Sequence, residues 1–447
     1  MKNLSFLVYK ISHYMPGQRI SARLRHGTAV LAAFVLFVWA MGAAFISAAA
    51  PAQTMDTQKQ TQVIHRIIDT INENYVFADV AKKMGEHLLK QLKKGAYKKI
   101  SDPKEFARVL TNDLRDICHD LHLSVDYYAE PPRQRPGAPS DPEEIRRQLS
   151  YSNFDFETVQ RLAGNVGFLK LNSFISAEYG GATAVAAMNF LANCDALIID
   201  LRENRGGQPS MIQLINSYFF ESPVHLNSFY IRKGDKTQQF WTQAHVQGKR
   251  MTDVDIYVLT GNRTFSGAEE FTYNLKNLKR GTIIGETTGG GAHPMRSHYF
   301  EDLQFGIRVP YGRAVNPISG TNWEGTGVKP DIEVPQVEAF DTAYKLALKN
   351  LAAKAKTPED KRRIETDINI EGYRLLGRKK VKEAFKIFTM NAEVFPESSN
   401  VYNSLADAYM ADNNKELAIQ YYKKSLELNP ENENAKKRLK ELESKEK

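Results

Sequence analysis

The chain has 447 residues, of which 42% are hydrophobic and 25% are charged, and its formal net charge is +8. These fractions are those of an ordinary globular protein with two or three domains, so they exclude global disorder. Residues 1–50 contain five Lys or Arg and no acidic residue, which leaves a charge of only +3 for the other residues. The positive charge is therefore concentrated at the N-terminus, and no nucleic-acid partner is expected.

An uncharged run of 19 residues, 28–46, follows these basic residues and precedes the small residues at 47–52. Basic, apolar and small-residue segments in this order are typical of an export signal, here residues 1–50. The run is also long enough to span a bilayer, so an uncleaved N-terminal anchor is the alternative. In either case we expect the protein to be periplasmic or otherwise exported, with membrane contact only through this segment.

Cys118 and Cys194 are the two cysteines of the chain. In an exported protein they could form one disulfide or remain two buried thiols, and their spacing matches no metal-binding motif. No metal and no cofactor are expected.

Residues 55–127 are predicted to form a helical N-terminal domain, because apolar residues recur there at helical spacing, as Val63, Ile67 and Ile71 do. A Pro-rich connector at 131–139 follows. It has no core-forming residues, so we expect an exposed loop.

Residues 128–340 are predicted to form an α/β core, because short Val- and Ile-rich runs alternate with helical segments from about residue 165. Such central strands are apolar on both faces, and the loops at their ends usually carry the functional groups. The predicted strands are 166–171, 196–201, 256–260, 282–285, 305–309 and 332–334.

Residues 365–445 contain a repeat with a period of 34 residues. It is carried by three pairs, Ala384 and Ala418, Phe388 and Tyr422, and Pro396 and Pro430, with Gly372 matched by Ala406. This period is typical of tetratricopeptide repeats, which are all-α. Two repeats are short for a free-standing solenoid, so we expect them to dock on the core or to bind a partner peptide.

The stretch 255–294 is predicted to run from a buried strand through a tight turn into a helix that opens at Ser266, and then into a second strand followed by glycines. The first side chain of such a helix lies beside free backbone N–H groups and the positive end of the helix dipole. That position suits a nucleophile whose oxyanion must be stabilised. Ser266 and Glu269 also form a capping box, so Ser266 could serve only as a helix cap.

A second glycine-containing turn, Gly206-Gly207, follows the strand at 196–201. Paired glycines let the backbone turn sharply and direct N–H groups into a cleft, although a plain tight turn has the same signature. A serine nucleophile also needs a base. The histidines in suitable loops are His122 and His293, with His119 close by.

Five motifs in this order resemble the C-terminal processing, or tail-specific, serine peptidases, in the branch related to interphotoreceptor retinoid-binding protein. They are NVGFLKLNSF, ALIIDLRENRGG, TFSGAEEF, GETTGGGAHP and TNWEGTGVKPDIEV, and NENYVF in the helical N-terminal domain matches as well. The resemblance covers about residues 57–340. It implies a crotonase/ClpP-like α/β core and an exported serine endopeptidase that acts on a peptide or protein substrate.

The resemblance also implies roles for individual residues. Ser266 falls on the nucleophile, and His122 of the D-x-H motif falls on the base of the tricorn-type relatives. Glu324 of NWEG falls on the acidic partner. The oxyanion-hole backbone falls on Gly206, Gly207 and Gly267.

Three departures from the family pattern matter. The processing peptidases use a lysine base about two dozen residues after the serine, whereas residues 287–293 contain no lysine and end in His293, which is the reserve base. The tricorn relatives have a serine before the histidine, where this chain has Leu121. The segment between His122 and the first core strand is too short for a peptide-binding PDZ domain, so substrate tails must be recognised in another way.

Two other functions remain open from the sequence. Relatives of the retinoid-binding branch carry apolar ligands on this fold, so the chain could be a non-catalytic carrier of a lipid or retinoid-like molecule. It could also be a tetratricopeptide adaptor with an inactive peptidase core. A complete set of Ser266, His122 and Glu324 favours the peptidase.

Overall fold

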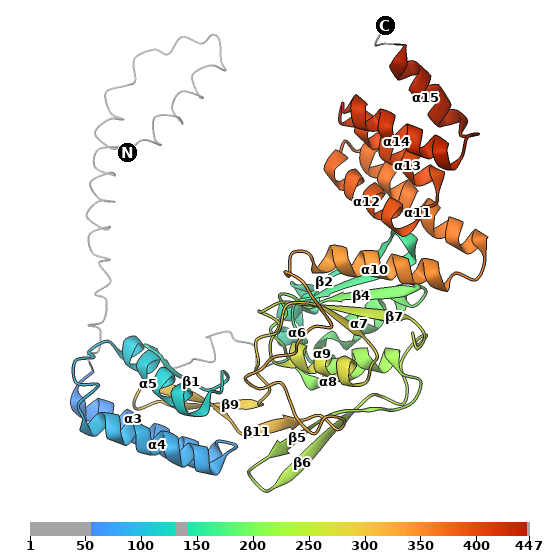
Figure 1. Ribbon diagram of the computed structural model, residues 1–447. Helices are drawn as coiled ribbons and strands as arrows, with labels where there is room; N and C mark the ends of the chain where they lie inside the picture. The colour runs from blue at the N-terminus through green and yellow to red at the C-terminus, as the bar shows by residue number, and fades with distance from the viewer. Residues whose placement is uncertain (1–54, 131–140, 445–447) are drawn as a thin grey trace, which may run out of the picture. The chain divides into compact units, whose positions relative to one another are not determined.

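The computed structural model describes residues 55–130 and 141–444, and these belong to one compact unit that begins at Met55 (Figure 1). The predicted signal or anchor segment and the Pro-rich connector lie outside the described residues. Within the described ranges, every helix is too short or too polar to cross a membrane.

The N-terminal part consists of three helices that pack on a small antiparallel sheet. Two of the helices begin with an aspartate cap, Asp56 or Asp102, whose side chain accepts a backbone N–H. The apolar stripes predicted for this region are buried, with Val63, Ile67 and Ile71 fully inaccessible. The helices are α3 (Thr57–Asn74), α4 (Ala78–Lys93) and α5 (Pro103–Cys118). The sheet has the order β1 (Ser124–Tyr127), β10 (Phe305–Pro310) and β9 (Met295–Phe300).

One strand of the predicted α/β core lies elsewhere. The run 305–309 is the strand β10, but it pairs with β1 and β9 and packs on the N-terminal helices, so its assignment to the central sheet was wrong. An apolar run shows that a strand is buried but does not show which sheet it joins. As a result, residues 305–308 of β10 pair with residues 124–127 of β1, far from them in the sequence.

The central sheet has six strands, of which five are parallel, as the buried apolar runs predicted. β2 pairs antiparallel with β3 at one edge. The order is β12 (Ile332–Glu333), β8 (Thr282–Gly285), β7 (Asp255–Thr260), β4 (Ala196–Asp200), β3 (Val166–Leu171) and β2 (Phe156–Leu162). This mixed α/β architecture agrees with the predicted fold class.

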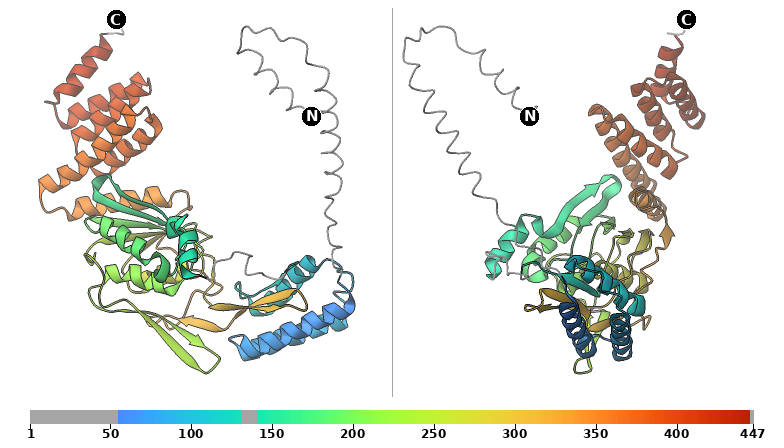
Figure 2. Two further views of the ribbon diagram at one scale, coloured as in Figure 1. Left: turned by 180° about the vertical axis from the view of Figure 1, so that it is seen from behind. Right: turned by 90° about the vertical axis from the view of Figure 1, so that its left-hand side faces the viewer.

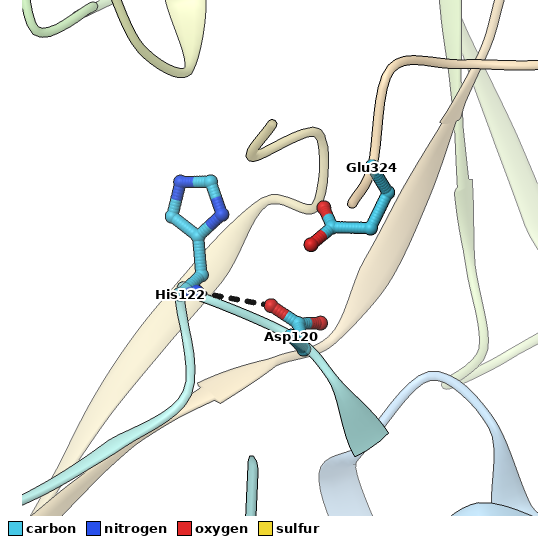
Figure 3. A group of neighbouring side chains, drawn as sticks. All are labelled: Asp120, His122 and Glu324. Atoms are coloured by element: carbon cyan, nitrogen blue, oxygen red, sulfur yellow. Dashed lines mark hydrogen bonds between the residues drawn. The ribbon is translucent and has the colours of Figure 1, made fainter. Parts of the chain in front are cut away.

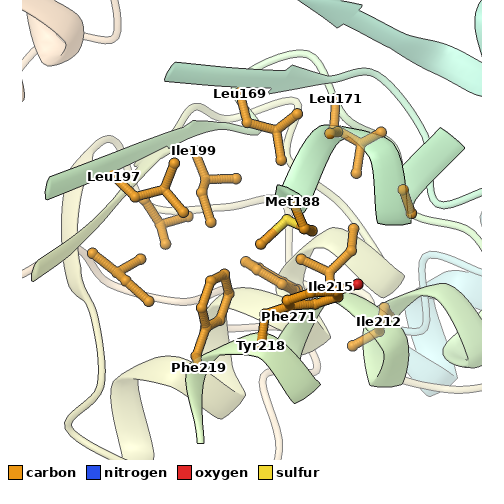
Figure 4. Packing of buried hydrophobic residues seen from close by; sticks show 14 of the residues in the cluster. Leu169, Leu171, Met188, Leu197, Ile199, Ile212, Ile215, Tyr218, Phe219 and Phe271 are labelled. Carbon is orange, nitrogen blue, oxygen red and sulfur yellow. The ribbon is translucent and has the colours of Figure 1, made fainter. Parts of the chain in front are cut away.

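Helices cover both faces of the central sheet (Figures 1 and 2). One face packs against α7 (Ala177–Leu191), α8 (Pro209–Asn216) and α9 (Gly267–Asn277). Figure 4 shows this cluster, in which Leu169 and Ile199 of the sheet meet Met188, Ile215 and Phe271 of the helices. The opposite face packs against α10 (Ala339–Lys354).

A third sheet was not predicted. It has the order β11 (Gly312–Val315), β5 (His225–Ile231) and β6 (Lys236–Trp241). Five of the six residues of β6 are exposed, so the strand lacks the apolar run that marks a core strand. Its single buried residue, Phe240, packs edge to face on Phe229 of β5, with ring centroids 4.8 Å apart.

After α10, the described part of the chain contains five more helices, which confirms the all-α prediction for the C-terminal region. Gly372 of α11 lies against Phe388 of α12, where a Cβ at 372 would be 2.3 Å from the Phe388 ring, so a larger residue at 372 would displace this ring. The helices are α11 (Pro358–Gly377), α12 (Val381–Val394), α13 (Ser399–Ala411), α14 (Lys415–Leu428) and α15 (Glu433–Glu443).

The first of these helices docks on the core. Ile364 and Ile368 of α11 are buried in the same cluster as strand residues of the central sheet. The Gly164 N–H donates to the Asp367 carboxylate at 2.8 Å. Of the two roles expected for the repeats, docking on the core is therefore observed.

Both cysteines are free thiols. Cys118 is half-buried at the end of α5, and Cys194 is buried beneath the central sheet. Burial raises the pKa of both thiols, so both are protonated and unreactive near neutral pH.

Candidate active site

Ser266 occupies the turn between β7 and α9, where the helix begins. Its φ of 54° and ψ of −119° are strained for a residue with a side chain, and such strain persists only where the surroundings fix it. Gly206 packs directly against this turn. A Cβ at Gly206 would lie 2.6 Å from the Gly267 nitrogen and 2.9 Å from Cβ of Ser266. Only glycine therefore allows the two loops to approach each other this closely.

The carboxylate of Glu269 holds the turn in place. It is fully buried and accepts the Ser266 N–H at 2.8 Å. It also accepts the Gly290 N–H at 2.7 Å, the Gly291 N–H at 2.9 Å and the Thr288 hydroxyl at 2.5 Å. Burial raises the pKa of Glu269, and these four donors oppose that rise. The predicted capping pair thus also fixes the glycine loop at 289–291 beside Ser266.

The glycines predicted for the oxyanion hole differ in what their amides do. Gly206 and Gly207 have φ of 102° and 143°, which favours glycine at both positions. The Gly206 N–H donates to Oδ1 of Asn204 at 2.8 Å, so Gly206 contributes conformation and not a free donor. The Gly207 and Gly267 N–H groups have no acceptor among the described residues. They lie side by side, since a Cβ on Gly267 would be 2.9 Å from the Gly207 nitrogen.

His122 follows α5 in the loop before β1 and reaches the nucleophile loop. Its ring packs on Phe265, the residue before Ser266, with centroids 4.8 Å apart. Burial lowers the pKa of His122 to about 4, so the ring is neutral near pH 7. Its Nδ1 is inaccessible to solvent and has no hydrogen-bond partner within the described part of the chain.

Asp120 joins the two candidate histidines, although no role was predicted for it from the sequence. It is 1% exposed, and its Oδ1 accepts the His122 backbone N–H at 3.0 Å. Its Oδ2 lies 2.7 Å from Nδ1 of His293 and accepts the Tyr75 hydroxyl at 3.4 Å. The D-x-H motif was the available signal, but its partner in the fold is 173 residues away.

Glu324 lies opposite Asp120. Its Oε2 accepts the Ala292 N–H at 2.5 Å and is 3.6 Å from Nδ1 of His293. Its Oε1 is buried and has no partner among the described residues. Burial raises the pKa of Glu324 to about 7, and the negative charge of Asp120 adds to this effect.

Figure 3 shows Asp120, His122 and Glu324 together. One ring nitrogen of His122 and one oxygen of each carboxylate all lie within 4.8 Å of one another. This donor set could hold a divalent cation, because imidazole and carboxylate are both common zinc ligands. It could equally share protons among its members. His119, by contrast, is an exposed left-handed residue at the end of α5 and lies outside the cluster.

Ser266, His122 and His293 line one cavity of about 550 Å³, together with Gly207 and Gly267. The structure therefore brings together the candidate nucleophile, both candidate bases and the two amides without an acceptor among the described residues. Glu324 adjoins the cavity through His293. Among the described contacts, no hydrogen bond joins Ser266 Oγ to either histidine, and in apo structures such catalytic bonds are often long.

Comparison with protein families identifies three regions of the chain. Residues 165–334 match Peptidase family S41, and residues 54–163 match the N-terminal domain of Peptidase S41 in eukaryotic IRBP. Residues 399–432 match the tetratricopeptide repeat, which is the second of the two repeats predicted from the sequence.

Individual relatives are distant. A "Probable CtpA-like serine protease" from Staphylococcus epidermidis is 23% identical over 172 residues, which are 38% of this chain and 34% of that protein. The chloroplastic C-terminal processing peptidase of Tetradesmus obliquus is 24% identical over 248 residues, which are 51% of each chain. The matches thus span about a third to a half of the length of these relatives.

Among solved structures, the photosystem II D1 C-terminal processing protease aligns with 14% identity and a TM-score of 0.41, covering 62% of this chain and 93% of that one. A lipoprotein from Streptococcus agalactiae aligns with 15% identity and a TM-score of 0.44, covering 66% and 97%. The chain thus contains a region that matches Peptidase family S41, preceded by a region that matches the N-terminal domain of that family and followed by a region that matches a tetratricopeptide repeat.

Proposed function

We propose that the protein is an exported serine endopeptidase of the tail-specific type, in which Ser266 is the nucleophile and His122 is the base. The observation that carries this proposal is the strained turn at Ser266, which lies beside the two free amides of Gly207 and Gly267 in a cavity that His122 also lines. A hydroxyl, two convergent N–H donors and a neutral imidazole are the groups that acyl transfer requires.

The reaction proceeds in two stages. Neutral His122 accepts the Ser266 proton as Oγ attacks the scissile carbonyl, and the Gly207 and Gly267 amides donate to the oxyanion. The His122 imidazolium then protonates the leaving amine, which leaves an acyl group on Ser266. Water, deprotonated by His122, releases the acyl group and regenerates the serine.

The carboxylates offset the charge that forms on His122. A histidine with a pKa of about 4 is a weak base in the free protein, so its protonated form must be stabilised during the reaction. Asp120 raises the pKa of His122 and fixes its backbone. Glu324, with a free buried Oε1 close to the ring, supplies a second negative charge when ionised.

His122 is preferred to His293 as the base because the two rings are bound differently. Nδ1 of His293 is engaged by Asp120 at 2.7 Å, and the ring is 5% exposed. The His122 ring lies against the residue that precedes Ser266 and has an unpaired nitrogen. His293 then positions Asp120 and Glu324, and it is the alternative base.

The proposal includes export and a protein substrate. Export rests on the basic and apolar order of residues 1–46, and an uncleaved segment would anchor the protein to a membrane. The catalytic chemistry implies a peptide or protein substrate. The repeat at 399–432 offers a surface for a further protein partner.

Labelling with a serine-directed phosphonate tests the proposal. Wild-type protein should form one covalent adduct on Ser266 and cleave unstructured peptides, whereas Ser266→Ala should do neither. Thermal unfolding of both proteins controls for folding. If the folded wild type forms no adduct and cleaves nothing, and instead retains a lipid after purification, the chain is a carrier and the proposal fails.

A further inference from the structure

Glu270 is a buried carboxyl in the substrate cavity that the proposed mechanism does not use. It is 3% exposed and lines the same cavity as Ser266. Its backbone N–H donates to the Ser266 carbonyl at 2.9 Å, which closes the first turn of α9. Glu270 therefore lies about one helical turn, roughly 6 Å along the axis, beyond Ser266.

The surroundings of Glu270 leave its charge uncompensated. In the described ranges, the carboxyl forms no ion pair with a Lys or Arg side chain. Burial raises the pKa of Glu270 to about 7, and the neighbouring Asn227 amide only partly opposes this rise. An unpaired buried carboxylate is costly, and a cation brought into contact with it would remove much of that cost.

The rest of the cavity wall suits a long cationic side chain. The described lining contains no Lys or Arg, and Glu270 is its single carboxylate. Phe229 and Phe240 also line the cavity, with Gln213 and Gln238. Aromatic rings pack well against the methylene stem of Lys or Arg and attract its charge, while the amides can accept further N–H donors.

We propose that Glu270 is the specificity determinant of this peptidase and selects substrates with Lys or Arg at the residue that supplies the scissile carbonyl. This inference rests on the proposed function, since it places that carbonyl on Ser266. The side chain of that residue enters the cavity past the nucleophile, and its cationic end reaches the Glu270 carboxylate. The bound cation takes the place of the counter-ion that the folded chain does not supply.

Matched peptides test this inference. Two fluorogenic peptides should differ only in Lys or norleucine before the scissile bond, because norleucine keeps most of the length of lysine without its charge. Wild-type protein should cleave the Lys peptide with a kcat/KM on the order of 100-fold higher. Glu270→Gln should lower that ratio to near one. The control Glu203→Gln removes a 44% exposed carboxylate outside the cavity and should keep the wild-type ratio.

The ratio separates recognition from a structural role. If Glu270 only supports the buried wall, both peptides lose activity in parallel, the ratio stays at its wild-type value, and the inference is wrong. Equal cleavage of the two peptides by wild-type protein also overturns it, even though phosphonate labelling of Ser266 would still uphold the peptidase. Absence of labelling in folded wild-type protein would instead remove the proposed function, and the inference with it.

A second measurement covers the case in which Glu270→Gln does not fold. Arginine amide and norleucine amide are added to wild-type protein before the phosphonate. Arginine amide should slow labelling at a concentration at least 10-fold lower than norleucine amide, since its guanidinium can pair with Glu270. Equal protection by the two amides would contradict the inference.

Discussion

The two sides of the candidate active site are built in opposite ways. On the side of Ser266, the Glu269 carboxylate is fully buried and accepts four hydrogen bonds, which tie Ser266 to the glycine loop. On the side of His122, its Nδ1 and the Oε1 of Glu324 are buried without partners among the described residues. The first side is satisfied in the free protein, and the second is not.

The difference fits the two tasks that the proposed mechanism gives these groups. The hydrogen bonds of Glu269 stay the same throughout the reaction, whereas those of His122 and Glu324 must change. An oxyanion hole works because its donors are already in place, so the loops that form it gain from a saturated carboxylate such as Glu269. A proton relay must change its hydrogen bonds in each step, so its groups cannot all be saturated beforehand. The unpaired atoms of His122 and Glu324 are the ones that a proton, a water or the substrate would engage.

Replacement of His122, the proposed base, should lower the catalytic rate more than replacement of His293 or Glu324. We expect His122→Ala to lower kcat by about 10³-fold, within the range for loss of a general base. His293→Ala should lower it by about 10-fold, through loss of positioning of Asp120 and Glu324. Single-turnover peptide cleavage measures both, with thermal unfolding as the control for folding. Full activity in His122→Ala, with loss in His293→Ala, would move the role of base to His293.

Removal of the Glu324 charge should have a smaller effect that depends on pH. A carboxyl with a pKa of about 7 is neutral below this pH and ionised above it, and only the ionised form stabilises the His122 imidazolium. The kcat of wild-type protein should therefore rise as the pH increases through about 7. Glu324→Gln should lower the upper plateau by roughly 30-fold and abolish this rise. A rise that persists in Glu324→Gln would assign it to another group.

Loss of the Glu269 carboxylate, which accepts four hydrogen bonds, should lower the stability of the protein as well as its catalytic rate. Glu269→Gln removes the charge that accepts four donors, and one amide NH₂ of the variant would face donors. We expect the free energy of unfolding to fall by about 2–3 kcal/mol, as for the loss of a buried hydrogen bond to a charged group. Urea unfolding measures this change. Glu270→Gln on the same helix serves as the comparison, and an equal loss there would mean that Glu269 has no special role.

Deletion of the distal repeat should have the smallest effect. Removal of 399–447 takes away α13 to α15 but leaves α10 and the buried residues Ile364 and Ile368 in contact with the sheet. Turnover of short peptides should stay within about 2-fold, because no residue of this region lines the cavity. Deletion from residue 347 onward is the contrast, since it exposes a face of the central sheet and should prevent folding.

The pH dependence of the free energy of unfolding tests whether His122 is buried. Its pKa falls from 6.5 to about 4 on folding because of burial, so the unfolded chain binds the extra proton between these values. The stability that the neutral ring contributes is complete above about pH 6.5 and is lost as the pH falls towards 4. In His122→Asn this part of the pH dependence of urea unfolding should disappear. An unchanged profile would show that the ring is solvated.

The sequence predicted those parts of the molecule whose signal is local. Five of the six predicted strands lie in the central sheet, because buried parallel strands are continuous apolar runs. Ser266 and Glu269 are three residues apart, so their relation was visible as a capping box. Glu269 could not be predicted to reach Gly290 and Gly291, because a cap motif does not say what else a buried carboxylate accepts.

The parts that could not be predicted depend on contacts between distant segments. The pair of Asp120 and His293 joins residues on either side of the core, and no periodicity relates them. Strand β10 was recognised but was placed in the wrong sheet, since pairing with β1 bridges more than 170 residues of chain. Strand β6 is mostly exposed, and exposed strands have no hydrophobic signature.

The glycine at 291 limits which side chains fit beside His122. It lies 25 residues after Ser266, in the region where the processing peptidases have their lysine. A Cβ there would be 2.2 Å from the Phe265 ring and 2.6 Å from Cε1 of His122. A lysine at 291 and the present position of His122 therefore exclude each other. A lysine at this position would therefore require the loop at 289–291 and the His122 ring to take other positions together.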